Sequence, residues 1–255
     1  MEVINCFWTG GNLNESGIIS INSFICTGHI LHLWHYKEVT NAPVGVVHRN
    51  ASEIVPLSVF KQWFPEGFSV DYRKTKIPTF ACYFRYKLIH KIGGWWCDAD
   101  IIALRLFDFI QDYVFCGQYF DDPQNEVAEG LRITNGTFKC PKECELLAKI
   151  IEEIEDKAIN AKDPGWGEWG PKYFTKKIIE FDLLKHKLEN NVFAPFPPGN
   201  SSLKFQFFDT NVEIPNWAYA LHLFNRSSMD IMANKDSLYD IYRRKYCREN
   251  YYMGL

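Results

Sequence analysis

Hydrophobic and polar positions along the chain follow two periods, and together they predict strands alternating with helices. Apolar runs at residues 3–8 and 44–47 are typical of short buried strands. Between them, residues 23–36 carry large side chains at helical spacing, which predicts a helix. The chain is therefore predicted to begin with a β-α-β unit.

The centre of the chain repeats this pattern more sharply. Apolar residues recur at helical spacing over residues 79–91, and the Gly-Gly pair at 93–94 predicts the end of that helix. The apolar run 95–97 predicts a strand, and the acidic residues Asp98 and Asp100 follow it directly.

The second half of the chain continues the alternation of strands and helices. Its pattern predicts a strand and loop at 114–137, a helix opening at Pro141, a helix after Pro171, and short strands that include residues 217–222. Strands alternating with helices favour an α/β fold with a mixed, mostly parallel sheet flanked by helices. Nothing in the sequence divides residues 1–255, so a single domain is expected, in which residues 236–255 form a basic, aromatic C-terminal helix.

Composition narrows the classes of protein. The chain is 47% hydrophobic and 23% charged, which is enough apolar material for one sizeable core, and its net charge of −3 argues against a nucleic-acid partner. The eight cysteines include no CxxC pair, which indicates reduced thiols and no zinc site. Without a signal-like start or a long apolar run, a cytoplasmic location is expected.

Asp98 and Asp100 are the strongest candidates for chemistry. Side chains two apart on an extended backbone share a face, so both carboxylates could hold one divalent cation. Hard oxygen ligands suit Mg²⁺ or Mn²⁺. A pair of this kind is also common in solvated turns, so the motif alone leaves both interpretations open.

The residues around the pair carry a resemblance to a known family. Residues 85–100 place an arginine on a helix, a Gly-Gly turn, an aromatic strand and then the acidic pair. This block resembles glycosyltransferases with the GT-A fold that use nucleotide sugars. It is most similar to the yeast initiating mannosyltransferases and bacterial capsular polysaccharide sugar transferases, and more distantly to the glucosyltransferase domains of clostridial toxins.

Four other segments are similar to that family in the same order. Residues 7–11 resemble its first loop, residues 23–36 its first helix, residues 169–171 the Gly-Pro that opens a late helix, and residues 220–223 its terminal histidine segment. The resemblance covers most of the chain, up to about His222.

The resemblance implies roles for individual residues. Asp100 would be the direct metal ligand, Asp98 would bridge metal and ribose, and His222 would be the distal metal ligand. Arg85 would face the donor sugar or its phosphates, so the catalytic set is Asp98, Asp100 and Arg85. The donor-binding set that it implies is Phe7, Trp8, Thr9, Arg85, Asp98, Ala99 and Asp100.

The implied reaction moves a sugar from a nucleotide diphosphate donor, of UDP or GDP type, to a carbohydrate or lipid-linked glycan acceptor, with Mn²⁺ or Mg²⁺. Retention of anomeric configuration and a place in surface polysaccharide or glycan biosynthesis also follow from the resemblance. Taken without it, Arg85 fits an exposed helix residue and His222 a core histidine bonded to backbone.

Two positions depart from the family pattern. Cys82 stands where relatives often have an aspartate that bonds the donor sugar, and thiols are poor acceptors. Met229 stands where they often have a tryptophan that helps to close the donor site. The first departure bears on which donor sugar is bound, and the second bears on how the donor site closes.

Acceptor residues are expected in two loops. Trp166, Glu168 and Trp169 lie in a Gly-rich segment that predicts an exposed loop suited to sugar binding, although packing against the sheet is the alternative. Asp122 and Glu129 lie in an acidic loop that could orient an acceptor hydroxyl or simply be solvated.

Two further patterns have simpler explanations. The tail combines tyrosines with basic residues, so it could contact anionic lipid at the inner face of a membrane or could form a terminal helix with a basic outer face. His29, His32 and His35 are expected on the polar flank of the helix predicted over 23–36, and a metal cluster there is not favoured.

Two rival functions stay open. A phosphatase or phosphotransferase could use an acidic pair of this kind, but Ile101 and Ile102 follow Asp100 where that class has a DxDx(T/V) pattern. A lectin-like relative without turnover would keep the fold, and Cys82 leaves that alternative open.

Overall fold

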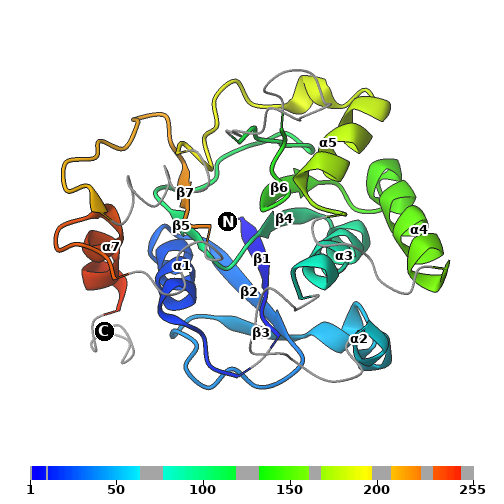
Figure 1. Ribbon diagram of the computed structural model, residues 1–255, viewed down its shortest axis with the longest axis horizontal. Helices are drawn as coiled ribbons and strands as arrows, with labels where there is room; N and C mark the ends of the chain where they lie inside the picture. The colour runs from blue at the N-terminus through cyan, green and yellow to red at the C-terminus, as the bar shows by residue number, and fades with distance from the viewer. Residues whose placement is uncertain are drawn as a thin grey trace.

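The computed structural model describes residues 2–9, 11–63, 77–118, 132–160, 168–196, 208–224 and 232–247. Strands and helices alternate along most of this length (Figure 1). The elements are β1 (Val3–Phe7), α1 (Glu15–Cys26), β2 (Ile30–His35), β3 (Val47–Asn50), η1 (Ala51–Glu53), α2 (Leu57–Trp63), α3 (Ile77–Ile92), β4 (Gly94–Cys97), β5 (Ile101–Ala103), β6 (Thr137–Cys140), α4 (Glu145–Asn160), α5 (Pro171–Glu180), η2 (Leu184–His186), β7 (Ala220–His222) and α7 (Leu238–Tyr246).

The main sheet has five strands in the order β3-β2-β1-β4-β6. Its first four strands are parallel, and β6 runs antiparallel to β4. A second, two-stranded sheet pairs β5 with β7 in antiparallel register. The predicted α/β class with a mixed, mostly parallel sheet flanked by helices is confirmed.

Each face of the main sheet buries its own hydrophobic core, because successive side chains on a strand point to opposite faces. On one face Ile4 and Leu31 pack with Phe24 of α1. On the other, Trp34 and Trp96 pack with side chains of α3, α4 and α5. Figure 1 shows α1 and α7 on one side of the sheet and α3, α4 and α5 on the other.

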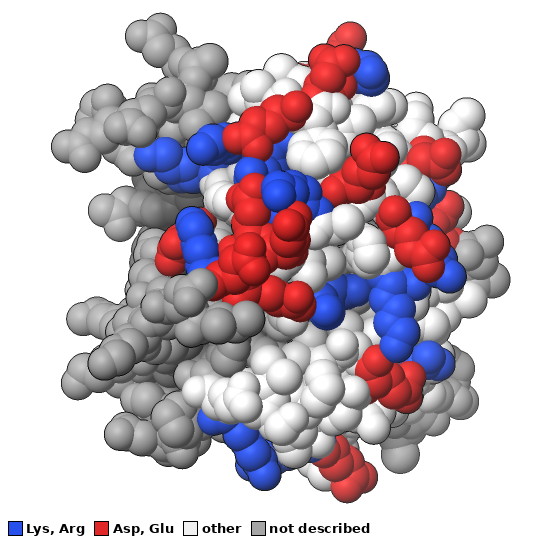
Figure 2. All heavy atoms as spheres, turned by 90° about the vertical axis from the view of Figure 1, so that its right-hand side faces the viewer, with Lys and Arg blue, Asp and Glu red and all other residues white. Residues whose placement is uncertain are grey.

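The helices on the second side have an outer surface of mixed charge. Figure 2 shows acidic and basic side chains interspersed on this face, without one broad patch of a single sign. Lys177 of α5 pairs with both Glu153 and Glu180 at 2.7 Å, and Lys87 of α3 pairs with Glu155 at 2.9 Å. These pairs link neighbouring helices across the surface.

The helix predicted over residues 23–36 is wrong in its second half. The structure ends α1 at Cys26 and begins strand β2 at Ile30. Between them Gly28 has a φ of 89°, a left-handed conformation that glycine adopts readily and that breaks the helix. The side chains of β2 then follow a near period of two, which the helical interpretation overlooked.

Two smaller boundaries and the placement of three histidines also differ from the prediction. The strand predicted at 44–47 lies later, as β3, and the helix expected from Pro141 begins at Glu145, because Glu143 takes a φ of 57° in a turn. The three histidines do not share a helix: His29 is buried before β2, and His32 and His35 lie within that strand.

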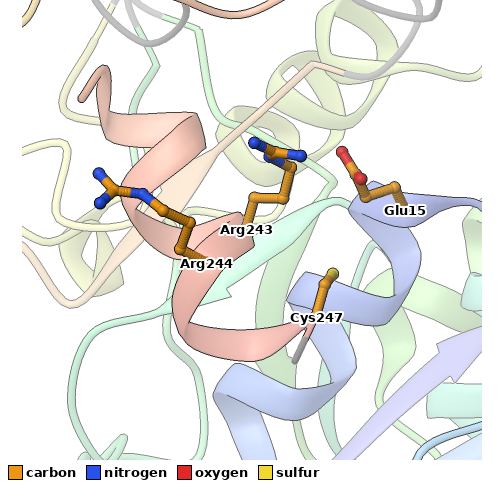
Figure 3. Close-up of a pocket in the computed structure, with 4 residues that line it drawn as sticks. All are labelled: Glu15, Arg243, Arg244 and Cys247. Carbon is orange, nitrogen blue, oxygen red and sulfur yellow. The ribbon is translucent and has the colours of Figure 1, made fainter. Parts of the chain in front are cut away.

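The C-terminal segment forms α7, which packs against α1 through a hydrogen bond of 2.8 Å from Tyr239 to Glu15. Figure 3 shows Glu15, Arg243, Arg244 and Cys247 around a hollow of about 270 Å³ between the two helices. Both arginines already pair with acidic residues of their own segment, since Arg243 contacts Asp240 at 2.7 Å and Arg244 contacts Asp236 at 2.6 Å. Residues 248–255 of the predicted helix lie outside the described residues.

Among the described residues, no helix combines the length and the apolar character that crossing a bilayer requires.

Candidate active site

The acidic pair is positioned by the turn between α3 and β4. Gly93 and Gly94 have φ values of 71° and 88°, so the chain reverses in a conformation that other residues rarely adopt. A side chain at Gly93 would also lie 2.8 Å from the backbone nitrogen of Lys142. The Gly-Gly pair thus directs β4 into the sheet, next to β1, with Asp98 at its carboxyl end.

Asp98 and Asp100 do not lie on an extended backbone, and the geometry expected for them is wrong in this respect. The chain turns at Ala99 and Asp100, with a hydrogen bond of 3.3 Å from the Ile101 nitrogen to the Asp98 carbonyl. The Asp98 nitrogen donates to the Gly136 carbonyl at 2.8 Å. The turn nevertheless brings the two carboxylates to one site.

His222 completes that site through the second sheet. Its partner in the β5–β7 register is Ile101, directly after Asp100, and the Leu223 nitrogen donates to the Asp100 carbonyl at 2.9 Å. His222 Nε2 therefore lies 3.4 Å from Asp100 Oδ1. Phe224, with a φ of 51°, stacks on the imidazole at a centroid distance of 3.9 Å and fixes its plane.

The three side chains fit a divalent cation. One ligand atom each from Asp98, Asp100 and His222 lies within 4.8 Å of the others. An octahedral ion with bonds of about 2.1 Å places its opposite ligands about 4.2 Å apart, so this spacing is suitable for Mg²⁺ or Mn²⁺. Two carboxylates suit either ion, and the imidazole favours Mn²⁺.

Gly136 keeps the centre of this cluster open. A Cβ at this position would lie 3.0 Å from Asp98 Oδ2 and 3.1 Å from His222 Cε1. The absence of a side chain thus allows the carboxylate and the imidazole to approach the same backbone.

Arg85 is buried, not exposed, and is directed into the site from α3. Its side chain is 6% exposed and lies 3.1 Å from Asp98 Oδ1. The guanidinium also donates to the Asn135 carbonyl and lies over the ring of Trp96, 5.0 Å from its centroid. Trp96 Nε1 donates to the same carboxylate at 2.8 Å. The arginine that the sequence singled out is therefore part of the acidic cluster.

Burial and charge act in opposite directions on these groups. Burial raises the pKa of Asp98, Arg85 opposes that shift, and Asp100 adds to it. Burial by itself would lower the pKa of His222, but the charge of Asp100 and its hydrogen bond to the imidazole raise it above the ordinary value. Excess negative charge around an imidazole is the electrostatic setting that a bound cation would neutralise.

The first loop contributes less exposed surface than expected. Phe7 is 8% exposed and its ring stacks on Phe84 at 4.3 Å between centroids, inside the core. Trp8 and Thr9 are partly exposed after the end of β1, and the Trp8 nitrogen donates to the Trp34 carbonyl at 2.9 Å. Donor binding by this loop stays a prediction, and Trp8 and Thr9 are better placed for it than Phe7. Ala99 is also partly exposed, in the turn between the two carboxylates.

Sequence reasoning missed Asn135 and Gly136. Asn135 is 4% exposed, and its side-chain nitrogen donates to the Tyr86 hydroxyl at 2.9 Å and to Cys82 Sγ at 3.4 Å. Cys82 is thus buried next to Arg85, and its sulfur accepts a hydrogen bond from within the protein. An Asn-Gly pair usually signals a turn, so only the fold reveals this arrangement.

The structure does not bring the predicted acceptor residues together at one site. Trp169 is 1% exposed and belongs to the core, so the expectation of an exposed loop is wrong at this position. Its carbonyl accepts from the Tyr86 hydroxyl at 2.9 Å. Glu168 is exposed and lies 3.3 Å from Lys157. Asp122, Glu129 and Trp166 lie outside the described residues, as does Met229.

No protein-family model matches the chain, and no curated protein matches its sequence. Three solved structures to which it is similar are glycosyltransferases. The PaToxG glycosyltransferase is 15% identical over 71% of this chain and 69% of that one, with a TM-score of 0.47. The galactosyltransferase LgtC, in complex with donor and acceptor sugar analogues, is 12% identical over 87% of this chain and 86% of that one, with a TM-score of 0.42.

The glycosyltransferase GlyE of Streptococcus pneumoniae TIGR4 is 12% identical over 74% of this chain and 45% of its own, with a TM-score of 0.34. All three TM-scores are below 0.5, and likeness at this level does not establish a function for this chain. A functional assignment must therefore rest on the chemistry of the site itself.

Proposed function

We propose that this protein is a metal-dependent glycosyltransferase that takes a sugar from a nucleotide diphosphate donor. The observation that carries the proposal is the convergence of Asp98 and Asp100, from the turn after β4, with His222 of β7, and the buried Arg85 of α3 bound to Asp98. A diphosphate leaving group requires concentrated positive charge, and a cation and a guanidinium at one site supply it.

The residues would divide the work as follows. Asp98, Asp100 and His222 would hold Mn²⁺ or Mg²⁺, which when bound would neutralise the charge that develops on the departing diphosphate. Arg85 contacts Asp98 at 3.1 Å and would lie beside that charge. Because Trp96 and the Asn135 carbonyl fix the guanidinium, little reorganisation is needed during the reaction.

The donor would lie at the carboxyl end of the main sheet, where β1 and β4 meet. Open α/β sheets bind ligands outside the carboxyl ends of their strands, and both the Trp8 loop and the acidic pair follow such ends. Trp8 and Thr9 would contact base and ribose, and Ala99 would allow the diphosphate to approach the turn.

The first experiment measures donor hydrolysis across UDP-, GDP- and dTDP-sugars, with Mn²⁺, with Mg²⁺ and with a chelator. We expect one donor to be hydrolysed only with metal, and Asp100→Ala to lose at least about a hundredfold of that rate. Asp112→Ala is the matched control, because Asp112 is an exposed aspartate on a different segment. A response that survives Asp100→Ala, or release of inorganic phosphate from simple phosphoesters instead of nucleotide from a donor, would contradict the proposal.

Finer features belong to the same proposal. The acceptor would be a carbohydrate or a lipid-linked glycan, the product would retain the donor's anomeric configuration, and the work would take place in the cytoplasm, in surface polysaccharide or glycan biosynthesis. The proton-coupling constant at the new anomeric centre, measured on the first product formed, distinguishes retention from inversion. Co-sedimentation with anionic vesicles tests contact of the basic tail with a membrane.

A further inference from the structure

Two histidines of the main sheet face each other near its outer edge, away from the acidic site. His35 ends β2, and His48 lies in the neighbouring edge strand β3. His35 Nε2 and His48 Nδ1 are 2.9 Å apart, and the two rings cross at 79° with their centroids 5.1 Å apart. Because β1 lies between β2 and β4, about two strand spacings, or about 10 Å, separate β2 from the strand that leads to Asp98.

The register of β2 and β3 places both imidazoles on one face of the sheet. His48 lies opposite Leu33, and His35 follows Leu33 by two residues, so these three side chains point to the same side. Trp34 and Arg49 are opposite each other and point to the other side, where the guanidinium lies over the indole. Strand pairing therefore sets the distance between the two histidines.

The pair is accessible and can present two lone pairs to a ligand. His48 is exposed, and His35 is partly exposed. Burial and the neighbouring His48 lower the pKa of His35, so this ring is uncharged at neutral pH. One ring of the pair donates an N–H to the other. If the donor ring carries its proton on its other nitrogen instead, both facing nitrogens have a free lone pair, without any change of charge.

The spacing of the two nitrogens suits a single transition-metal ion. Zinc binds imidazole nitrogen at about 2.0–2.1 Å, so two such bonds hold their nitrogens about 2.9 Å apart at a right angle and about 3.3 Å apart at the tetrahedral angle. The observed 2.9 Å lies at the near end of this range, so small rotations of the rings would direct both lone pairs at one ion. Imidazole ligands favour zinc, nickel and copper over the magnesium or manganese that carboxylates prefer.

We propose that His35 and His48 form a second metal site, which binds Zn²⁺, Ni²⁺ or Cu²⁺ with water in the remaining coordination positions. The site uses imidazole alone, so it needs none of the cysteines. Because its ligands come from adjacent strands, the ion binds only when β3 is paired with β2, and it therefore stabilises this edge of the sheet. Binding of the ion requires neither a donor nor an acceptor sugar.

Calorimetric titration with Ni²⁺ alone tests the site, on the full-length chain without an affinity tag. Every protein in the series also carries Asp100→Ala, so that the acidic cluster does not compete for the ion. We expect His35→Gln and His48→Gln each to weaken Ni²⁺ binding by at least about tenfold, because a single imidazole cannot chelate. His32→Gln is the matched control, since His32 also lies on β2 but on its opposite face, and it should leave the affinity unchanged.

Two further measurements identify the ligands. Ni²⁺ should raise the melting temperature of the Asp100→Ala protein with increasing concentration, and this rise should disappear when His48→Gln is added. His48 is exposed, so its replacement should leave the fold intact. Cu²⁺ bound to the Asp100→Ala protein should show two coordinated imidazoles by electron paramagnetic resonance.

The proposal is overturned if His48→Gln and His32→Gln bind Ni²⁺ equally well, or if the bound Cu²⁺ shows fewer than two imidazoles. An ion held instead by the exposed thiol of Cys26 would give this outcome. Loss of donor hydrolysis in any of these proteins has no bearing on the result, because each readout follows the ion and not the sugar.

Discussion

His29 and His222 are two nearly buried histidines whose surroundings shift their pKa values in opposite directions. Burial lowers the pKa of His29 to about 4, since its neighbours offer only neutral hydrogen bonds. Its Nε2 accepts from the Phe107 N–H at 3.0 Å, while Nδ1 faces the Phe24 carbonyl at 3.3 Å. At His222 the charge of Asp100 outweighs burial and raises the pKa.

The difference shows that one histidine is fixed by packing, whereas the other lies within a cluster of candidate metal ligands. Both nitrogens of His29 are engaged with groups that belong to the fold, so its imidazole links the end of α1 to the segment at Phe107. His222 presents Nε2 to Asp100 within a cluster of ligand atoms, so an ion can replace the proton there. Substitutions in the two regions should therefore have separable effects.

The largest expected effect comes from replacing each of the two histidines separately by glutamine. His222→Gln should lower metal-stimulated donor hydrolysis by at least about a hundredfold, because it removes a proposed metal ligand. The free energy of unfolding of this variant should change little. His29→Gln should lower the free energy of unfolding by about 1–3 kcal/mol and leave the turnover of folded protein near wild type. Steady-state rates and urea unfolding measure the two quantities. If His29→Gln abolished turnover while His222→Gln only destabilised the fold, the comparison would be reversed.

Arg85→Lys sharpens the description of the charged region. Lysine keeps the positive charge but cannot contact Asp98, the Asn135 carbonyl and the Trp96 face together, so we expect kcat to fall by several tens of fold. Arg105→Lys is the matched control, since Arg105 also lies over an aromatic ring, that of Tyr219, but on the outer surface. Equal losses in both variants would mean that the position within the site is irrelevant.

Gly136→Ala tests whether the open centre of the site matters. The added methyl group would crowd Asp98 and His222, so we expect Mn²⁺ affinity to fall by about tenfold with a small change in thermal stability. In Gly17→Ala the new Cβ would lie 3.1 Å from Asn14 Oδ1, a similarly tight contact on α1. Calorimetric Mn²⁺ titration should distinguish the variants, and an unchanged affinity in Gly136→Ala would remove this glycine from the site.

The smallest effect is the pH dependence that His29 contributes to stability. Its folded pKa of about 4 is below the unfolded value near 6.5, so the unfolded chain binds more protons between these limits. Stability from this group is complete above about pH 6.5 and is lost as the pH falls towards 4, by about 1–2 kcal/mol after allowance for solvent screening. The difference in unfolding free energy between wild type and His29→Gln, measured across this range, should shrink as the pH falls. A difference that is constant with pH would show that His29 is not held neutral.

Local signals explain which parts of the fold the sequence could predict. The sequence predicts the block from Arg85 to Cys97 well, because its helix period, its Gly-Gly stop and its aromatic strand are each set by neighbouring residues, whereas the turn at Asp98 and Asp100 differs from the extended backbone expected. Residues 23–36 were predicted poorly, because side chains at helical spacing continue past Gly28, where the backbone turns instead.

The rest of the site depends on contacts between distant segments. Asn135 and Gly136 matter because α3 and β7 approach them, and no local pattern encodes that approach. Trp169 looked exposed among glycines, but Tyr86 and the surrounding core bury it. The sequence thus singles out Asp98, Asp100, His222 and Arg85, which the structure brings together, whereas the backbone that surrounds them depends on the fold.

The pairing of β5 with β7 also has a consequence for the order of biosynthesis. The ribosome synthesises Asp98 and Asp100 well before His222, because residues 101–221 lie between them in the sequence. A nascent chain that ends before β7 would hold only an incomplete set of ligands and would retain a cation weakly. In the proposed metal site, capture of the ion should therefore follow the pairing of β5 with β7.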